Sequence, residues 1–468
     1  MKIPDRVIGN LELNNIKYSF EFDKDRFKLK LYHIEEENEY EMISGELKCF
    51  GVSLKEHKWV DKITIEGRTS EGYLIYFGVL DSPSSYNGYL TYNVNWYYVT
   101  NDDTDLVDEV RFFGRDIDCF YNPSRVFQKE IKYKEQKYLQ VDSISVQTVD
   151  SEALGGGSYI SDDVSMEISC DSYAIIHPEE TLPLESKSYL KLKFSKKIKL
   201  NTMFNEAGSV LKLFKYVNYR TNINIDDIST YIANENGKIR NCGKLVFKKR
   251  HEVERNEKAK DCIIKAEYLN NHVAEILKAI DSGEISFGHF CNSYEERSQY
   301  PISRIIMILA AFEREFRNIY GQDAIRSKAY KDTKEQIVKL IEDQAPNYTG
   351  DRKKYIKGFA KIISNIDSSY GDNLEYALKD CKDIMEPFVI RRFEGTYEEI
   401  IADISISVNK LRNGVAHSRL DLELKPRHLV DIKLVEEMIY VIRLKKIGIE
   451  ESTIKKSINE LFSENLDL

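Results

Sequence analysis

The hydrophobic pattern divides the chain into two parts with different periods. From about residue 14 to residue 200, short alternating or aromatic-rich runs are separated by clusters of Gly, Asn, Asp and Ser. Alternation with a period of two is typical of half-buried antiparallel strands. We therefore expect an antiparallel β-rich domain of the sandwich or barrel kind. The runs that carry this pattern are KYSFEF, RFKLKLYHI, DKITIEG, GYLIYFGVL, GYLTYNVNWYYVT, EVRFFG, KYLQV, VSMEIS and SYLKLKF.

The period becomes helical near Thr202. The apolar positions from Met203 to Val217 are spaced by three and four residues, which predicts one amphipathic helix beside the strands. One more strand, KLVFKK, precedes the highly charged segment at 250–261. Because that segment has few apolar residues, we place a domain boundary there. The expected domains are a β-rich domain at 1–253 and an all-α domain at 254–468.

Beyond the boundary the pattern predicts a helical bundle. The segment ISRIIMILAAFEREFRNIY is apolar on nearly every side, so we expect it to be a central buried helix. Thr333 and Gln336 have capping-box spacing at the start of another helix, and Pro387 is expected to end a third. The fold class is thus α+β, with two domains. The expected helices are 262–281, 302–320, 331–343, 353–369, 373–386, 397–413 and 430–446.

Composition excludes a membrane-spanning protein. The chain has 468 residues, of which 42% are apolar, and its longest apolar run is Ile305 to Phe312. A helix needs about 20 apolar residues to cross a bilayer. The first residues, MKIPDRVIGN, lack the apolar stretch of a secretory signal. We therefore expect a cytoplasmic protein with no membrane partner.

The net charge of −9 is unevenly distributed. Residues 1–120 contain 23 acids and 14 bases, which gives 14 − 23 = −9, so the remaining 348 residues are neutral overall. An acidic segment repels phosphate. If the protein binds nucleic acid, the later part of the chain should do so.

The seven cysteines do not suggest a disulfide framework or a metal site. They are scattered, and no two are spaced as Cys-x-x-Cys. Cys242, His251 and Cys262 come nearest to a metal cluster, with His289 and Cys291 further on, but these spacings match no common ligand pattern. We expect free thiols, no metal and no cofactor.

One short motif, NKLRNGVAHSRLD, carries the strongest candidate chemistry. Arg412 is followed directly by Asn413, and His417 comes four residues after that asparagine, so the last two would share a helix face. Gly414 would permit a bend that brings the arginine to the same side. A near-neutral imidazole can transfer protons, and an arginine can clamp a phosphate. The alternative is a structural helix end, where both cations stabilise terminal carbonyls.

Glu313 is a second candidate because it falls among apolar positions. An unpaired carboxylate in such a stripe would be costly, so it needs a cation. Arg412 is one candidate, which would place Glu313 in the site, and Arg317, one turn further on, is the structural alternative. Arg304 lies on another face, with no assigned role. The surrounding apolar positions are Ile306, Leu309, Ala310, Phe316 and Tyr320.

Two basic runs are candidates for RNA binding, FKKRH at 247–251 and DRKKYIKGFAK at 351–361. In the second run Lys353 and Lys354 are the candidate RNA contacts, and a solvated helix face is the alternative. Tyr355 and Phe359 are expected to pack inward.

These motifs resemble a known family. The sequence RNGVAH at 412–417 is similar to the Arg-polar-x-x-x-His motif of the HEPN ribonucleases (higher eukaryotes and prokaryotes nucleotide-binding), which are small α-bundles. The whole chain resembles the ApeA group of bacterial anti-phage proteins, with a β-rich first domain, a helix before the boundary, and a HEPN domain containing a stretch like YPISRIIMILAAFEREFRNIYG at 300–321.

The resemblance implies a metal-independent endoribonuclease of abortive infection, a hydrolase in which Arg412, Asn413 and His417 are catalytic. It would cleave cellular RNA, with transfer RNA among the candidates, and leave a 2′,3′-cyclic phosphate. A homodimer is implied, and we expect its two-fold contact around 397–446. The β-rich domain would sense a phage-derived protein or another infection trigger, for instance with exposed aromatic strands around Trp96 and Tyr97.

An alternative from another class is also consistent with the sequence. The helical domain could be a non-catalytic HEPN module that binds a nucleotide or a protein, and the β-rich domain an adhesion or glycan-binding unit.

Overall fold

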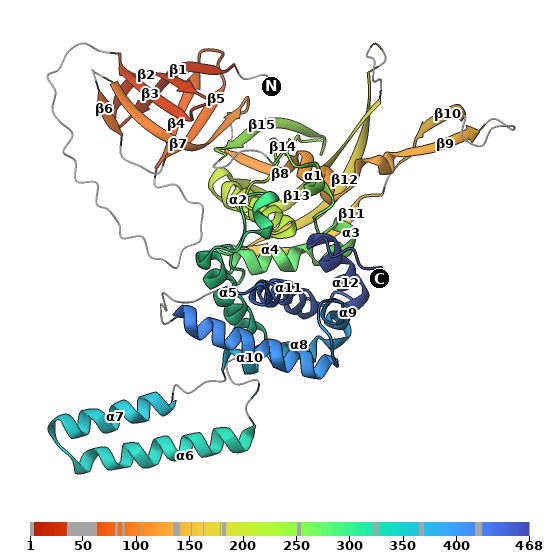
Figure 1. Cartoon of the computed structure of the whole chain (residues 1–468). Helices are drawn as coiled ribbons and strands as arrows, with labels where there is room; N and C mark the ends of the chain where they lie inside the picture. The colour runs from red at the N-terminus through yellow and green to blue at the C-terminus, as the bar shows by residue number, and fades with distance from the viewer. Residues whose placement is uncertain are drawn as a thin grey trace. The chain divides into compact units, whose positions relative to one another are not determined.

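The structure is a computed structural model of the whole chain, shown in Figure 1. It describes residues 4–467 except 35–62, 80–82, 87–88, 104, 134–140, 151, 162, 178, 180–183, 250–253, 322–324, 326, 365–368 and 417–423.

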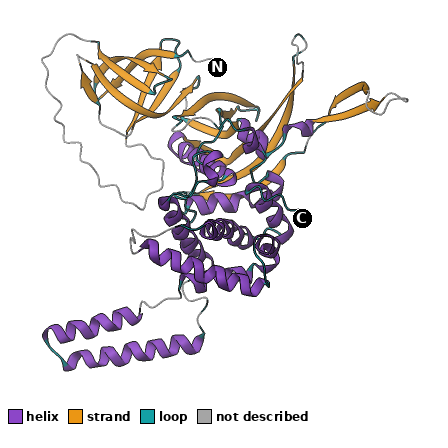
Figure 2. Ribbon diagram, in the orientation of Figure 1, coloured by secondary structure: helices purple, strands orange, loops and turns teal. Residues whose placement is uncertain are grey.

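The chain forms two compact units. The first contains Met1–Gly283 and Cys291–Glu296, and the second contains Glu284–Phe290 and Arg297–Leu468. Strands occur in the first unit and the long bundle helices in the second (Figure 2). The division falls later than the sequence-based boundary at 253/254, because helix α4 (Val273–Asp281) packs on α2 (Leu200–Asn218) and on a strand of the first unit.

The first unit begins with a closed barrel of six antiparallel strands rather than a sandwich. Strand β7 pairs with β3 on one side and with β5 on the other, which closes the ring β7-β3-β2-β1-β4-β5. Closure leaves no unpaired edge among these strands. The strands are β1 (Arg6–Leu13), β2 (Ile16–Asp23), β3 (Lys28–His33), β4 (Ile63–Thr69), β5 (Leu74–Val79) and β7 (Tyr89–Thr100), and the short β6 (Ser84–Tyr86) pairs with β7.

The alternation seen in the sequence produces the barrel core. Tyr18, Phe20 and Phe22 on β2 and Leu29 and Leu31 on β3 are all buried in one apolar cluster. Successive side chains of a strand point to opposite faces, so these alternate positions fill the interior while their neighbours face out.

The sheet continues beyond the barrel. Strand β7 also pairs with β15, and the order then runs β15-β14-β8-β13-β12-β11. A separate hairpin pairs β9 with β10. These strands are β8 (Leu106–Phe113), β9 (Phe127–Tyr133), β10 (Val141–Thr148), β11 (Leu154–Ser161), β12 (Val164–Ile176), β13 (Leu184–Lys199), β14 (Asp227–Ala233) and β15 (Ile239–Phe247), and the remaining helices of this unit are α1 (Arg115–Phe120) and α3 (Ala266–Leu269).

The aromatic residues of β7 from Tyr92 to Tyr98 are buried, which contradicts the expectation of an exposed aromatic surface around Trp96 and Tyr97. Tyr97 lies in the barrel core and packs edge-on against Phe22, with ring centroids 5.0 Å apart. The ring of Trp96 packs on Phe204 of α2 at 3.9 Å. Successive residues of one strand thus face the barrel interior and the helix outside it, so both are structural.

The second unit is helical, as expected. Helix α11 is its central element, because the residues from Asp431 to Leu444 are buried on almost every side. None of the described helices of either unit combines the length and apolarity needed to cross a membrane. The helices of the second unit are α5 (Ile302–Tyr320), α6 (Lys328–Gln344), α7 (Gly350–Ser364), α8 (Tyr370–Asp380), α9 (Lys382–Arg392), α10 (Tyr397–Ala416), α11 (Pro426–Lys446) and α12 (Glu451–Leu461).

Three local predictions for this unit are wrong. Helix α5 is not enclosed, since Ile306 and Met307 are exposed and only one face is buried. Thr333 lies inside α6, where its hydroxyl donates to the carbonyl of Ala329, and Ser327 caps the helix instead. Pro387 lies inside α9 rather than ending a helix, because the chain already breaks at the C-cap residue of α8.

Candidate functional site

Arg412 lies near the carboxyl end of α10 and contacts side chains of two kinds. Its Nη2 is 3.7 Å from Oε2 of Glu313 on α5, and its Nη1 donates to Oδ1 of the neighbouring Asn413 at 3.4 Å. These contacts are with side chains rather than with the terminal carbonyls of α10. The arginine therefore links two bundle helices, and its side chain is 40% exposed, so it remains accessible to a ligand.

Glu313 is shared by two arginines. Arg317 Nη2 donates to its Oε1 at 2.7 Å, and Arg412 approaches its other oxygen. Both arginines suggested by the sequence therefore contact Glu313, and Arg317, the structural alternative, is the closer of the two. The stripe assigned to Glu313 was wrong, because Ile306 and Ala310 on the same side of α5 are exposed, and the carboxylate is only half-buried. An ion pair between partly exposed side chains contributes little to the free energy of folding. Stability alone is therefore a weak reason for this cluster.

Tyr370, the first residue of α8, adds a buried hydroxyl that sequence reasoning missed. Its ring packs on Phe312 with centroids 5.4 Å apart, and its hydroxyl has no hydrogen-bond partner among the described residues. Burial raises the pKa of Tyr370 well above its ordinary value, the charge of Glu313 adds to the rise, and Arg412 opposes it. The phenol thus stays protonated near a carboxylate and a guanidinium.

A close helix contact positions this tyrosine. A Cβ on Gly371 would lie 2.8 Å from the carbonyl oxygen of Ser405 and 3.2 Å from Cβ of Asn409, so only glycine allows α8 to approach α10 so closely. Ser369 and Asp372 form a reciprocal capping box at the same helix start. Cap and glycine together fix the start of α8, which carries Tyr370, against α10.

The motif on α10 is described in part. Asn413 is exposed and Gly414 is buried, and the helix continues through both to Ala416, so the glycine does not interrupt it. His417 lies outside the described residues. Its stacking with Asn413 and its catalytic role therefore stay predictions.

Arg304, whose role was open, is part of a buried ion pair. Its Nη2 donates to Oε1 of Glu436 on α11 at 2.8 Å, and its Nη1 donates to the carbonyl of Gln299 at 2.6 Å. The Tyr300 hydroxyl donates to the other oxygen of the same glutamate at 2.7 Å. This group fastens the segment before α5 to the central helix, which is a structural role.

Lys353 and Lys354 lie exposed on α7 and remain candidate RNA contacts. The expectation that Tyr355 and Phe359 pack inward is wrong, because both are among the most exposed large apolar side chains of the chain. The other run, FKKRH at 247–251, falls partly outside the described residues.

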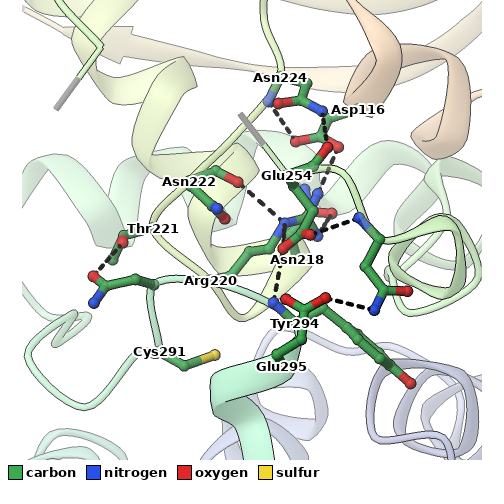
Figure 3. Close-up of polar contacts among 12 residues, drawn as sticks. Asp116, Asn218, Arg220, Thr221, Asn222, Asn224, Glu254, Cys291, Tyr294 and Glu295 are labelled. Carbon is green, nitrogen blue, oxygen red and sulfur yellow. Dashed lines mark hydrogen bonds and ion pairs between the residues drawn. The ribbon is translucent and has the colours of Figure 1, made fainter. Parts of the chain in front are cut away.

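A second polar cluster, in the first unit, surrounds Arg220 (Figure 3). Its guanidinium donates to Asp116 and to Asn218, each at 2.6 Å, and to the carbonyl of Asn222 at 3.1 Å. Glu254 lies beside it and accepts from the backbone N–H of Tyr294 at 2.7 Å. These buried groups join the ends of α1 and α2 to the segment Cys291–Glu296. Because the arginine is saturated with partners from its own fold, the cluster is a structural cross-link.

In the part of the chain that the structure describes, no group of three or more His, Cys, Asp or Glu side chains is arranged to hold a metal ion. The six described cysteines have free thiols. His251 of the weak Cys242, His251 and Cys262 cluster lies outside the described residues.

The chain matches no known protein family, and no curated protein or solved structure shows significant similarity to it.

Proposed function

We propose that the helical unit is a metal-independent endoribonuclease of the HEPN kind, which acts in bacterial anti-phage defence. The observation that supports this most directly is the arrangement of Arg412 at the end of α10, paired across the bundle with Glu313 and lying beside Asn413. An accessible guanidinium held by a carboxylate of another helix is oriented for a ligand without being saturated.

The proposed reaction uses these residues in defined roles. Arg412 binds the scissile phosphate, and His417 takes the proton from the ribose 2′-hydroxyl. The 2′-oxygen then bonds to phosphorus while the bond to the 5′-oxygen breaks, and the leaving oxygen takes a proton from an imidazolium. The products are a 2′,3′-cyclic phosphate and a 5′-hydroxyl. DNA cannot react in this way because it lacks the nucleophile.

The scheme needs two imidazoles, one as base and one as proton donor, which favours a dimer in which two copies of His417 meet. Helix α11 is enclosed within one chain, so of the helices in 397–446 we place α10 at the two-fold contact near His417. Asp403, Ile406, Lys410 and Asn413 form its exposed face. Ile406 is 56% exposed on this face. An exposed apolar side chain at this position is consistent with a surface that a partner covers.

In the proposed biological role the protein acts in the cytoplasm and cleaves cellular RNA, with transfer RNA among the candidates, when the β-rich domain senses a phage-derived protein or another trigger. Since a toxic ribonuclease requires restraint, the first unit would supply it. The acidic charge of residues 1–120 disfavours that region as the RNA-binding surface.

The test is expression toxicity combined with RNA cleavage. We expect the full-length protein, in the presence of its trigger, to arrest growth and to fragment cellular RNA, and both effects to vanish in His417→Ala and Arg412→Ala. Lys379→Ala on α8 is a matched control for loss of one surface cation. Circular dichroism must show that the variants fold. Equal toxicity in wild type and variants would instead support a non-catalytic binding module.

The chemical groups at the ends of the RNA fragments identify the mechanism. Fragments should carry 2′,3′-cyclic phosphate ends, and cleavage should persist in chelator. Loss of cleavage in EDTA with recovery on adding Mg²⁺ would exclude the metal-independent reaction.

A further inference from the structure

Helices α6 and α7 form an antiparallel hairpin with one uncovered apolar face. None of the residues of α6 is buried, and only Ala360 of α7 is. The two helices lie side by side in Figure 1 and are joined by a short turn around Asn347. A hairpin this exposed buries little of its own apolar surface, which indicates a missing partner. We call the following five exposed side chains the hairpin face: Ile337, Leu340, Tyr355, Phe359 and Ile362.

The geometry of the hairpin places these five side chains on one side. Each of them directly precedes a less exposed residue of the inner surface between the helices: Val338, Ile341, Ile356, Ala360 and Ile363. One residue turns a helix by about 100°. The apolar stripe of each helix is therefore rotated in the same sense from the contact between them. Because the helices run antiparallel, equal rotations bring both stripes to the same side of the hairpin.

The exposures show that this face is unpartnered over its whole length. Leu340 is 66% exposed and Ile362 is 61% exposed, although they belong to different helices. Three of the five side chains are aliphatic. Such side chains cannot stack on nucleobases in the way that aromatic rings do, so the composition favours a protein partner over RNA.

The charged residues beside the hairpin face indicate which partner fits it. Asp332 and Asp343 are separated by eleven residues, or about three turns, and lie on the edge of α6 away from α7. Lys354 and Lys361 are separated by seven residues and lie on the edge of α7 away from α6. Asp351 shares the edge of α7 with the two lysines, and Lys339 lies close to the two aspartates of α6, so the face is flanked by a net negative edge and a net positive edge. A second copy of the same hairpin, turned by a two-fold axis parallel to the helices, brings each basic edge against an acidic edge.

We propose that the hairpin face binds the hairpin face of a second copy of this chain, which forms an antiparallel four-helix arrangement. In this arrangement α6 of one copy packs on α7 of the other, the apolar stripes meet, and opposite charges line both edges. All four chain ends leave at the same end, so the remainder of each second unit can approach its counterpart. The proposal does not depend on RNA cleavage.

The experiment measures the dimer dissociation constant of the full-length protein by sedimentation equilibrium. Leu340→Glu with Phe359→Glu should raise it at least tenfold, because both carboxylates would be buried in the contact. Both positions are exposed in the single chain, so the variant should retain its helix content, which circular dichroism checks. An unchanged dissociation constant in this variant would overturn the proposal.

A charge exchange tests the orientation. Lys354→Glu with Lys361→Glu should weaken the dimer, and adding Asp332→Lys with Asp343→Lys in the same chain should restore it, because each edge again meets its opposite. Lys353→Glu with Lys357→Glu makes the same change of charge on the far side of α7 and should leave the constant unchanged. Equal weakening by both lysine pairs, or no restoration, would contradict this arrangement.

A separate measurement tests whether the hairpin face binds RNA instead. Binding of a single-stranded 2′-O-methyl RNA should be the same in Tyr355→Ala with Phe359→Ala as in wild type. If this variant loses RNA binding while the dimer constant is unchanged, the face is an RNA platform and the proposal fails.

Discussion

Arg412 and Glu313 lie on different helices, α10 and α5, and their nearest charged atoms are 3.7 Å apart, while Arg317 holds the other oxygen of the same carboxylate at 2.7 Å. One acid therefore compensates two accessible cations. A phosphate that binds Arg412 must compete with this carboxylate, so Glu313 should control the affinity of the site for RNA.

This relationship predicts the effect of Glu313→Gln. Removing the negative charge should tighten binding of a non-cleavable 2′-O-methyl RNA several-fold and should make the salt dependence of binding steeper, because both arginines become available to phosphate. Filter binding at several salt concentrations measures both. Glu375→Gln on α8, which removes the carboxylate of an equivalent pair with Lys379, should change neither. Weaker binding by Glu313→Gln would show that orientation of Arg412 by the carboxylate outweighs the competition with phosphate.

Tyr370→Phe should stabilise the fold. A buried hydroxyl without a described partner costs on the order of 1 kcal/mol, and its removal recovers that free energy. Thermal unfolding should therefore shift upward. Tyr397→Phe is the matched control, because that buried hydroxyl donates to the carbonyl of Leu378 at 2.7 Å, and its loss should be destabilising. If Tyr370→Phe also lowers cleavage at least tenfold, the hydroxyl serves the site. A destabilised Tyr370→Phe would reveal a partner for the hydroxyl.

The pair of Arg304 and Glu436 should be essential for the second unit. Arg304→Met leaves a buried carboxylate without its cation, and this should cost about 3–5 kcal/mol of unfolding free energy. Adding Glu436→Gln should recover part of that loss, since the uncompensated charge is gone. Urea unfolding measures both. Lys382→Met, which breaks the exposed pair with Glu398, should leave the transition almost unchanged. No recovery in the double variant would indicate that Arg304 acts through its carbonyl contacts alone.

His289 should make the stability of the fold depend on pH. Burial lowers the pKa of His289 from its ordinary value of 6.5 to about 3, with a smaller contribution from Arg304. The unfolded chain takes up a proton as the pH falls below 6.5, but the folded chain does so only near pH 3. The stabilising contribution is therefore complete above pH 6.5 and is lost as the pH falls toward 3, by about 1.4 kcal/mol per unit.

Urea unfolding at pH 7 and pH 5 tests this. The wild type should lose about 2 kcal/mol more than His289→Gln over that interval. His33→Gln, at an exposed position of β3, should behave as the wild type. An identical pH dependence of wild type and His289→Gln would exclude this histidine as the source.

Much of the organisation of the chain could be predicted from its sequence. The alternation in KYSFEF and RFKLKLYHI predicts strands, and the structure has β2 and β3 there. The spacing in residues 302–320 predicts α5 at its observed bounds. The spacing of apolar residues reflects the repeat of the local backbone conformation, so it predicts helices and strands before the tertiary fold is known. Closure of the barrel was beyond such reasoning, because it depends on a pairing of β5 with β7.

Only the tertiary structure decided which of these elements are enclosed. The segment 302–320 has the more apolar sequence, yet α11 is the central helix and carries buried charges that are each matched by a partner, as Glu436 is by Arg304. For the candidate site, the sequence by itself identified Arg412, Asn413 and His417 as a motif suited to phosphate chemistry and Glu313 as a carboxylate that needs a cation. It left open whether Arg412 or Arg317 pairs with Glu313 and could not place Tyr370 beside them, because such contacts depend on helix packing between residues that are distant in the chain.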